Sequence, residues 1–323
     1  MNIDTSSVAA EISRIGNICV RENEPMSVHT TLGVGGPADV FVEVPTESDL
    51  ISLMKYLSRC QLPWMVIGDG TNLLVSDLGI RGVVISLTGD FREVRVMEPY
   101  IEAGASAKLS TVADLAAEHN LAGFEPVGVV PGTVGGAIVM NAGTHAGYID
   151  QVIQKVYAIS SSGKPLEFSR EECEFSYRNS RFQNDKSLII TRALLRLYPG
   201  DGVEIRKLLD RIRRHRAESQ PSGKSAGCFF KNLSVHGKSA QVGGDYCVSA
   251  GKLIEQAGCK GLSQGDAIVS DVHANFIINR GSATAVDILC LAERVRQIVK
   301  EKTGVELEYE VRIVGEWQDQ VRN

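Results

Sequence analysis

Long apolar runs are missing from this sequence of 323 residues. No stretch approaches the roughly 18 apolar residues that a membrane-spanning helix needs. The opening segment, MNIDTSSVAAEISRIGNICV, contains acids and has no apolar run of signal-peptide length. Lysine and arginine total 34 against 39 acids, a net charge of −5, so no global basic field favours nucleic acid or a membrane surface. We therefore expect a cytoplasmic protein with neither kind of partner.

Paired cysteines and metal-ligand spacings are also lacking. The sequence has seven cysteines and no Cys-x-x-Cys motif, and its six histidines are dispersed. An odd number of scattered cysteines argues against a disulfide framework. The sequence therefore predicts reduced thiols and no metal site.

Helix and strand patterns alternate in a way that predicts an α+β protein. Thr46 is placed to cap a helix that runs to Cys60, in which apolar residues recur every three or four positions. Residues 283–302 show the same periodicity, and Gly304 is expected to end that helix. The segments predicted as strands are 40–44, 64–67, 83–85, several within 152–197, and 311–314.

Other segments predict further elements and a boundary. Residues 100–123 suggest a strand, a turn and a helix that Gly123 closes. A charged helix over 203–219 precedes Pro221, which marks the division between two halves of the chain. The sequence assigns no role to the segment 234–249.

A first glycine loop follows the predicted strand 64–67 in the sequence IGDGTNLLVSD. Successive backbone N–H groups in such a turn can hold phosphate oxygens, and glycine allows a close approach. The spacing resembles Gly-x-Gly-x-x-Gly, but Leu73 replaces the third glycine, so an ordinary strand–turn remains an equal alternative. The candidate cofactor residues are Gly68, Asp69, Gly70, Thr71, Asn72 and Leu73.

A second, denser glycine run extends from Gly128 to Gly147. Such density costs chain entropy, and a cofactor that lies against bare backbone would explain it. A Rossmann domain concentrates its phosphate contacts in one early loop, whereas two separated loops favour another flavin fold. The candidates here are Pro131, Gly132, Thr133, Gly135, Gly136, Asn141, Ala142 and Gly143.

Eight motifs in order resemble the UDP-N-acetylenolpyruvoylglucosamine reductase family over roughly residues 28–315. They are HTTLGVGGPADVFVEV, GDGTNLLV, PGTVGGAIVMNAG, FSYRNSRF, SAGCFFKN, GKLIEQAGCKG, HANFIIN and LEYEVRIVG. The resemblance implies non-covalent FAD in a domain of the vanillyl-alcohol oxidase or p-cresol methylhydroxylase type. It also implies that NADPH reduces the flavin, which reduces the enolpyruvyl ether of UDP-N-acetylglucosamine to UDP-N-acetylmuramate during peptidoglycan precursor synthesis.

The resemblance also implies a domain arrangement. An FAD-binding domain would span residues 27–199, with two subdomains split near 90–100. A smaller α+β substrate-binding domain would span residues 205–315, with its last strand returning to the FAD domain. The short gap between the YRNS and SAGC motifs resembles the family's type II branch, and a monomer is expected.

Three residues match the family's catalytic positions. Arg178, in SYRNS, matches the arginine that stabilises the negative charge built up on the substrate, a role that suits a guanidinium. Glu310 matches the family glutamate, although Glu306 and Glu308 would share its face of a strand and a register slip to Glu308 stays open. Without the surrounding motifs, Arg178 would be interpreted as a surface arginine near a turn, and Glu306, Glu308 and Glu310 as the solvent-exposed face of a strand.

Cys228 departs from the family pattern, which usually has a serine proton donor at this position of SAGCFFKN. A thiol, with a reference pKa of about 8.5, is a stronger acid than a hydroxyl and is mostly protonated near pH 7. It could therefore donate one proton from the same place. One alternative is an inert buried cysteine. A metal ligand is the weakest alternative, because no partner ligands are suitably spaced.

Softer candidates for the substrate pocket are Tyr177, Lys231, Asn232, Gln256 and His273, of which Lys231 and Asn232 directly follow the cysteine motif. Each could equally be structural. The basic helix with Arg206, Lys207, Arg211, Arg213, Arg214 and Arg216 could attract an anionic nucleotide, but charged helices usually just face water.

Two other functions stay open at this stage. An FAD oxidase or dehydrogenase of the same fold could act on another substrate, although neither His29 nor His145 lies in a flavin-attachment motif. A non-catalytic nucleotide-binding protein could have kept the fold, and Cys228 is its best support. Intact Arg178 and Glu310 argue against it.

Overall fold

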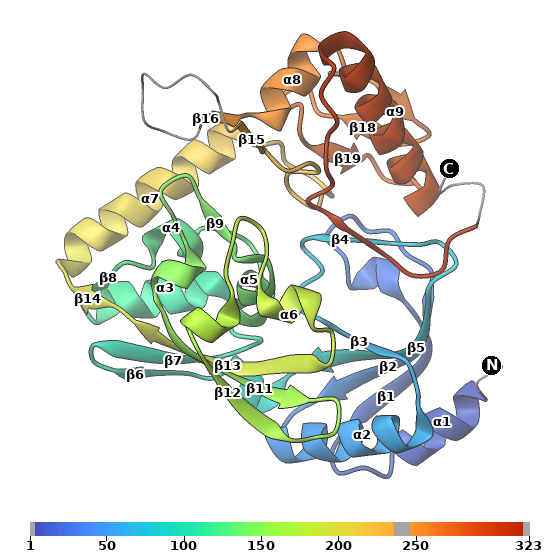
Figure 1. Cartoon of the computed structure of the whole chain (residues 1–323), viewed down its shortest axis with the longest axis vertical. Helices are drawn as coiled ribbons and strands as arrows, with labels where there is room; N and C mark the ends of the chain where they lie inside the picture. The colour runs from blue at the N-terminus through green and yellow to red at the C-terminus, as the bar shows by residue number, and fades with distance from the viewer. Residues whose placement is uncertain (1–3, 236–245, 319–323) are drawn as a thin grey trace. The chain divides into compact units, whose positions relative to one another are not determined.

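The structure, a computed structural model, describes residues 4–235 and 246–318 (Figure 1). The chain forms two compact units that alternate along the sequence. Unit 1 comprises Met1–Glu24, Ala38–Asp69 and Arg81–His215, and unit 2 comprises Pro25–Pro37, Gly70–Ile80 and Arg216–Asn323. The predicted domains, 27–199 and 205–315, are consecutive stretches. The assignment of an FAD-binding and a substrate-binding domain to these two stretches remains a prediction.

Unit 1 contains most of the regular structure. Its helices are α1 (Thr5–Ile12), α2 (Glu47–Cys60), α3 (Leu109–Glu118), α4 (Glu125–Gly128), α5 (Val134–Met140), α6 (Arg181–Asn184) and most of α7 (Gly202–Ser219). Its longer strands are β1 (Cys19–Pro25), β2 (Pro37–Val44), β3 (Trp64–Ile67), β5 (Ile80–Leu87), β6 (Val94–Met97), β7 (Tyr100–Gly104), β11 (Ile153–Ser160), β12 (Pro165–Ser169) and β13 (Leu188–Arg196). The pairs β8 (Leu121–Ala122) with β14 (Tyr198–Pro199) and β9 (Gly143–Thr144) with β10 (Gly147–Tyr148) are short.

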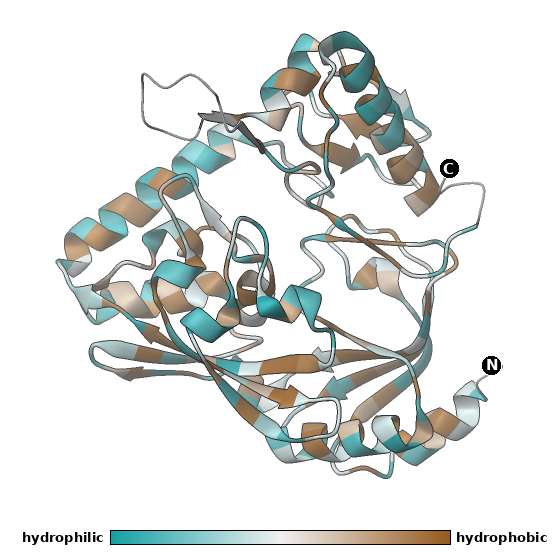
Figure 2. Ribbon diagram, viewed as in Figure 1, coloured by the Kyte–Doolittle hydropathy of each residue, from teal (hydrophilic) through white to brown (hydrophobic). Residues whose placement is uncertain are grey.

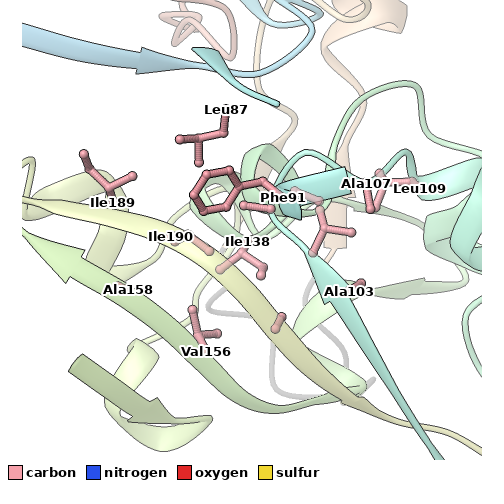
Figure 3. Packing of buried hydrophobic residues seen from close by; sticks show 14 of the residues in the cluster. Leu87, Phe91, Ala103, Ala107, Leu109, Ile138, Val156, Ala158, Ile189 and Ile190 are labelled. Carbon is pink, nitrogen blue, oxygen red and sulfur yellow. The ribbon is translucent and has the colours of Figure 1, made fainter. Parts of the chain in front are cut away.

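Two sheets organise unit 1. One has the strand order β1-β2-β5-β3 and the other β12-β11-β13-β7-β6. Helices α3, α5 and α6 pack against the second sheet, as Figure 1 shows. A single apolar cluster serves both sheets, and Figure 3 shows Phe91 within it among Leu87, Ala103 and Ile138. One continuous core of this kind fixes β3, after which the first glycine loop begins, and α5, which lies inside the second glycine run.

Unit 2 is a smaller α+β unit. Its elements are β4 (Leu73–Val75), β15 (Leu233–Val235), β16 (Tyr246–Val248), α8 (Ala250–Gln256), β17 (Ser263–Gln264), β18 (Ala267–Val269), β19 (Ile277–Asn279), α9 (Ala285–Thr303) and β20 (Arg312–Val314). β20 pairs in parallel with β4, so a segment from early in the chain joins the C-terminal strand. The segment without an assigned role, 234–249, contributes to the pair β15–β16, and its middle, 236–245, lies outside the described residues.

Several predicted elements are confirmed. The Thr46 side chain caps α2 by accepting from the Asp49 N–H, and Leu50, Leu53, Met54 and Leu57 are fully buried. β3 has the predicted bounds, and Gly304 ends α9 with a left-handed φ of 72°. In Figure 2 the basic helix α7 is largely teal with brown bands, in keeping with its few buried residues. Strong local periodicity is what these correct predictions share.

Three predictions are wrong. Gly123 does not close α3, which ends at Glu118, before Asn120 adopts a left-handed φ of 56°. The glycine run is not all loop, because α5 lies inside it and begins after the Thr133 cap. The acids 306, 308 and 310 do not lie on a regular strand, since in that stretch only a single bridge forms, between Tyr309 and Phe230.

No helix within residues 4–235 and 246–318 combines the length and the apolar composition required to cross a bilayer.

Candidate active site

The first half of the first glycine loop belongs to unit 1. Gly68 directly follows β3, and a Cβ atom added there would lie 2.6 Å from the Thr133 Oγ1 atom. Asp69 forms an ion pair with Lys108, which immediately precedes α3. The absence of a side chain at Gly68 therefore lets the two glycine loops approach each other.

A cavity of about 380 Å³ opens between these two loops, within unit 1. Its lining consists of Ile67, Gly68, Asp69, Ser86, Leu87, Arg92, Ser106, Ala107, Lys108, Thr111 and Thr133. Small residues predominate, and the charged residues are Arg92, Lys108 and Asp69, of which Lys108 and Asp69 pair with each other. The volume lies in the range of ligand pockets, and the lining suits a flat organic group that carries anionic oxygens.

The second glycine loop is ordered by its own polar groups. The Thr133 Oγ1 atom accepts a hydrogen bond from the Gly136 N–H (3.3 Å), and the Gly135 N–H donates to the Ala105 carbonyl (2.8 Å). Pro131 is exposed, and Gly132 adopts a φ of 131° that only glycine adopts readily. The loop therefore places α5 against β7 and keeps its own backbone close to the cavity.

Asn141 ends α5 and connects the glycine run to the SYRNS segment. It has a left-handed φ of 42° and is buried, and its Nδ2 atom donates to the Ser176 carbonyl (3.1 Å). Ala142 follows with its N–H bonded to the Ala137 carbonyl (2.8 Å). A Cβ atom at Gly143 would overlap the Gly147 carbonyl, because β9 and β10 pair closely there.

Arg178 lies in a tight turn in unit 1. Ser176 and Asn179 exchange backbone hydrogen bonds (3.0 and 3.1 Å), which forces Arg178 to a left-handed φ of 52°. Its Nη2 atom donates to the Gly143 carbonyl (3.4 Å), and its guanidinium lies 5.3 Å from the ring centre of Tyr177. A long side chain rarely adopts a positive φ, and such strain is concentrated at functional sites.

The second half of the first glycine loop belongs to unit 2. Gly70 has a φ of 62°, and a Cβ atom there would overlap the His29 carbonyl. Among the described residues, no acceptor is bonded to the backbone N–H groups of Gly70, Thr71 or Asn72. Three successive N–H groups of this kind are suited to an oxyanion.

Asn72 also has a structural role that its position in a glycine loop did not indicate. Its Nδ2 atom donates to the Glu310 carbonyl (3.0 Å), and its own carbonyl accepts from the Arg312 N–H (3.0 Å). Leu73 then starts β4 opposite Arg312. The first glycine loop therefore holds the LEYEVRIVG segment in place within unit 2.

The SAGCFFKN segment is clamped by Asn275, a residue that sequence reasoning missed. The Phe230 N–H donates to the Asn275 Oδ1 atom (2.9 Å), and the Asn275 Nδ2 atom donates back to the Phe230 carbonyl (2.8 Å). Asn275 is only 2% exposed, and Cys228 forms a bridge with the neighbouring Phe276. The motif HANFIIN contained the only signal, an asparagine among apolar residues that could pair with a buried backbone.

Glu308 and Glu310 have different environments. The Glu308 side chain is largely exposed and pairs with Lys231 (3.4 Å). Glu310 is half-buried, and its N–H donates to the Phe229 carbonyl (2.9 Å), adjacent to Cys228. Glu310 is therefore the acid whose backbone is bonded to the residue directly after Cys228, whereas the Glu308 carbonyl accepts from the Lys231 N–H (2.8 Å).

The softer candidates are distributed over both units. Tyr177 is in unit 1, and Lys231, Asn232, Gln256 and His273 are in unit 2. The Asn232 Oδ1 atom accepts from the Ala250 N–H (3.0 Å) at the start of α8, whereas Gln256 is exposed near that helix's end. His273 packs edge-on against Phe276 (4.9 Å between ring centres), and burial lowers the pKa of its imidazole.

Unit 2 therefore brings together Cys228, Lys231, His273 and Glu310, and unit 1 brings together Arg178, Tyr177 and the second glycine loop. On the basic helix α7, Lys207 pairs with Glu204 of the same helix (2.8 Å), and Arg213 pairs with Asp114 of α3 (2.7 Å). Within the described part of the chain, no three histidine, cysteine or acidic residues cluster as metal ligands.

Comparison with known families identifies both parts of the chain. Residues 38–169 match the model of an FAD binding domain, and residues 219–314 match the model of the UDP-N-acetylenolpyruvoylglucosamine reductase C-terminal domain. These matches agree with the fold class expected from the sequence.

Full-length relatives extend the match. A UDP-N-acetylenolpyruvoylglucosamine reductase of Caldanaerobacter subterraneus subsp. tengcongensis is 45% identical over 295 residues, which cover 91% of this chain and 93% of that protein. One of Heliobacterium modesticaldum is 40% identical and covers 93% and 92% respectively. The crystal structure of the reductase from Thermus caldophilus superposes with a TM-score of 0.75 at 35% identity, covering 92% of this chain and 98% of that one.

Proposed function

The chain belongs to the UDP-N-acetylenolpyruvoylglucosamine reductase family of FAD-dependent oxidoreductases, and we propose that it reduces the enolpyruvyl ether of UDP-N-acetylglucosamine to UDP-N-acetylmuramate. NADPH is the proposed reductant, and the product enters peptidoglycan precursor synthesis in the cytoplasm, with the enzyme acting as a monomer. One observation supports the proposal: Cys228, a residue able to donate a proton, and Glu310, a carboxylate, lie on neighbouring hydrogen-bonded segments of unit 2.

The glycine loops fit FAD on structural grounds. Gly68 keeps open a cavity lined by small residues and by Arg92 and Lys108, and a side chain at Gly68 would meet Thr133. Gly70, Thr71 and Asn72 offer N–H groups to an anion. When bound, FAD would accept reducing equivalents from NADPH and pass a hydride to the substrate's terminal alkene carbon.

Arg178 would stabilise the negative charge that spreads into the substrate carboxylate. Its turn fixes the backbone in a strained conformation, and the contact with the Gly143 carbonyl and the rings of Tyr148 and Tyr177 limits its rotamers. A guanidinium that is oriented before the reaction stabilises developing charge without a reorganisation cost. Glu310 would orient the substrate or its carboxylate, since the bonds from Glu310 to Phe229 and from Asn72 fix its backbone.

Cys228 would deliver the proton to the carbon adjacent to the carboxylate. The S–H bond breaks, a C–H bond forms, and the resulting thiolate regains a proton from water. Asn275 bonds to Phe229 through its main chain and to Phe230 through its side chain, which limits the movement of the thiol. Lys231, Asn232, Gln256 and His273, together with Tyr177, would contact the UDP-sugar.

Anaerobic half-reactions test the function. NADPH should bleach the bound flavin, and enolpyruvyl-UDP-N-acetylglucosamine should restore its colour. Acid precipitation should release the flavin into the supernatant; flavin that stays in the pellet would indicate a covalent oxidase instead. If reduced enzyme is not reoxidised by this substrate, the proposed function is wrong.

Variants of Cys228 test the proton donor separately. Cys228→Ser should keep substantial turnover, because a hydroxyl can donate from the same position. Cys228→Ala should leave flavin reduction by NADPH unchanged and slow the second half-reaction, by about 10²-fold if general acid catalysis makes its usual contribution. An alanine variant with undiminished turnover would exclude Cys228 as the donor.

A further inference from the structure

Tyr309 contacts both of the residues that follow Cys228. Its ring stacks on Phe230 (5.4 Å between ring centres, 22° between planes) and meets Phe229 edge-on (5.8 Å, 78°). Both phenylalanines are buried, and Tyr309 directly precedes Glu310 in the chain. The side chain of Tyr309 therefore contacts the segment of Cys228, while its backbone continues into the neighbouring carboxylate residue.

Helix α9 holds the Tyr309 side chain from a third direction. The Tyr309 hydroxyl donates to the Glu293 carboxylate (2.6 Å), and the Arg296 guanidinium lies 5.0 Å from the centre of the Tyr309 ring. Arg296 also donates to both oxygens of Glu293 (3.0 and 2.9 Å), and its Nε atom donates to the Leu307 carbonyl (3.0 Å). We call Glu293, Arg296 and Tyr309 the α9 anchor.

Apolar packing alone does not account for the hydroxyl of Tyr309. A phenylalanine could stack on Phe230 and Phe229 in the same way, and aromatic pairs tolerate a wide range of separations. A hydrogen bond is more demanding in distance and angle. Burial and the bond to Glu293 both raise the pKa of Tyr309, so the hydroxyl stays protonated and remains a donor. The bond therefore fixes where the ring lies.

The position of the ring matters because two backbone hydrogen bonds join its segment to that of Cys228. The Lys231 N–H donates to the Glu308 carbonyl (2.8 Å), and the Glu310 N–H donates to the Phe229 carbonyl (2.9 Å). These bonds lie on either side of Tyr309 in the chain. A displacement of the ring is thus passed on to both segments, and displacing a reacting group by about 1 Å can slow a reaction about 10²-fold.

We propose that the α9 anchor sets the position of Cys228 relative to Glu310, with Tyr309 a positioning residue that acts through Phe229 and Phe230, and Glu293 one that acts through Tyr309. This inference rests on the proposed function, because it concerns the step in which Cys228 donates its proton. It assigns a role in that step to a helix that carries none of the candidate site residues.

Half-reactions test the α9 anchor. Tyr309→Phe removes the hydroxyl and keeps the stacked ring, and Glu293→Ala removes its acceptor from an exposed position. Each should slow the reoxidation of pre-reduced enzyme by substrate about tenfold, as expected for a displacement below about 1 Å, and leave flavin reduction by NADPH unchanged. Glu293→Gln should keep most of the rate, because its amide oxygen can accept from the same hydroxyl.

Two further variants sharpen the comparison. The matched control is Glu301→Ala, an exposed acid of α9 that accepts from Gln297 of the same helix (2.6 Å), and it should keep the wild-type rate. Because Glu293 acts through the Tyr309 hydroxyl, the double variant Tyr309→Phe/Glu293→Ala should be no slower than the slower single variant. Effects that multiply in the double variant would overturn this assignment of Glu293.

Hydrogen exchange at the Lys231 and Glu310 amides provides a readout that needs no turnover. Tyr309→Phe should speed their exchange about tenfold, the equivalent of one hydrogen bond. The inference requires both effects: faster exchange with wild-type reoxidation would mean a purely structural role, and slower reoxidation with unchanged exchange would mean that the hydroxyl does not act by position. If reduced wild-type enzyme is not reoxidised at all, the proposed function fails instead, and unchanged exchange in Tyr309→Phe would still overturn the anchor separately.

Discussion

Replacement of Asn275 by alanine tests whether the clamp on the SAGCFFKN segment is the main support of the cysteine. Asn275 is 2% exposed and satisfies both backbone groups of Phe230 with its side chain, at 2.9 and 2.8 Å. The separate bond from the Phe229 N–H to the Asn275 carbonyl (2.7 Å) involves main chain on both sides and survives the substitution. Asn275→Ala therefore removes two buried hydrogen bonds and leaves the chain path unchanged.

The loss of stability follows from the Phe230 N–H and carbonyl groups that the substitution leaves without a partner. A buried donor or acceptor without a partner costs about 1–3 kcal/mol, so two of them cost about 2–6 kcal/mol. Alanine leaves space that a water molecule can enter, which recovers part of this loss. We therefore expect the free energy of unfolding of unit 2 to fall by about 3 kcal/mol. Asn275→Leu fills that space without a polar atom and should cost more than Asn275→Ala.

Urea unfolding can isolate unit 2 because the chain has two tryptophans, Trp64 in unit 1 and Trp317 in unit 2. In a Trp64→Phe background, Trp317 fluorescence reports on unit 2 alone. Gln264→Ala, at an exposed position of β17, is the control and should change stability by less than about 0.5 kcal/mol. A loss below about 1 kcal/mol for Asn275→Ala, or a leucine variant more stable than the alanine variant, would refute the reasoning.

Three further substitutions test other parts of the chain. Gly70→Ala should reduce the FAD bound per folded protein by about tenfold, measured by absorbance after gel filtration, because a left-handed φ and the His29 carbonyl both oppose a side chain. Thr284→Ala should lower stability by about 1 kcal/mol in urea unfolding, since it breaks the capping box with Asp287 at the start of α9; an unchanged midpoint would contradict this. Burial lowers the pKa of His273 below its unfolded value, so the unfolded state takes up a proton first and wild-type stability should fall as pH decreases below about 7. His273→Asn should flatten that pH dependence, as measured by urea midpoints at pH 7.5 and 5.5.

The elements that sequence analysis predicted correctly are those specified by local patterns. α2 has its capping threonine and apolar stripe within one continuous stretch, and α9 has its periodicity and its terminal glycine. Helix α5 was missed because its two glycines, Gly135 and Gly136, and the asparagine that ends it resemble a loop locally. Its stability comes from the Thr133 cap and from packing against β13 and β7.

Features that depend on distant pairing could not be predicted from the sequence. Nothing local to residues 70–80 indicates that they join the C-terminal part of the chain, since the reason is the parallel pairing of β4 with β20. The clamp by Asn275 likewise joins segments that are remote in sequence. The turn at Arg178 is local, between Ser176 and Asn179, but Asn141, which bonds to it, lies far away in the sequence. The motifs identified candidate site residues, but they did not show which groups hold those residues in place.

The choice between Glu308 and Glu310 shows that hydrogen-bond partners determine the environment of a side chain more than sequence periodicity does. A strand would have placed both carboxylates on one face, and sequence spacing alone could not separate them. The backbone is irregular there. The Lys231 N–H donates a hydrogen bond to the Glu308 carbonyl (2.8 Å), and the exposed Glu308 carboxylate pairs with the Lys231 ammonium. Glu310 has its N–H bonded to Phe229 and its carbonyl bonded to Asn72. Exchange of Glu308 for glutamine therefore removes only a solvent-exposed ion pair, whereas the same exchange at Glu310 alters a carboxylate whose backbone two separate segments hold beside the cysteine motif.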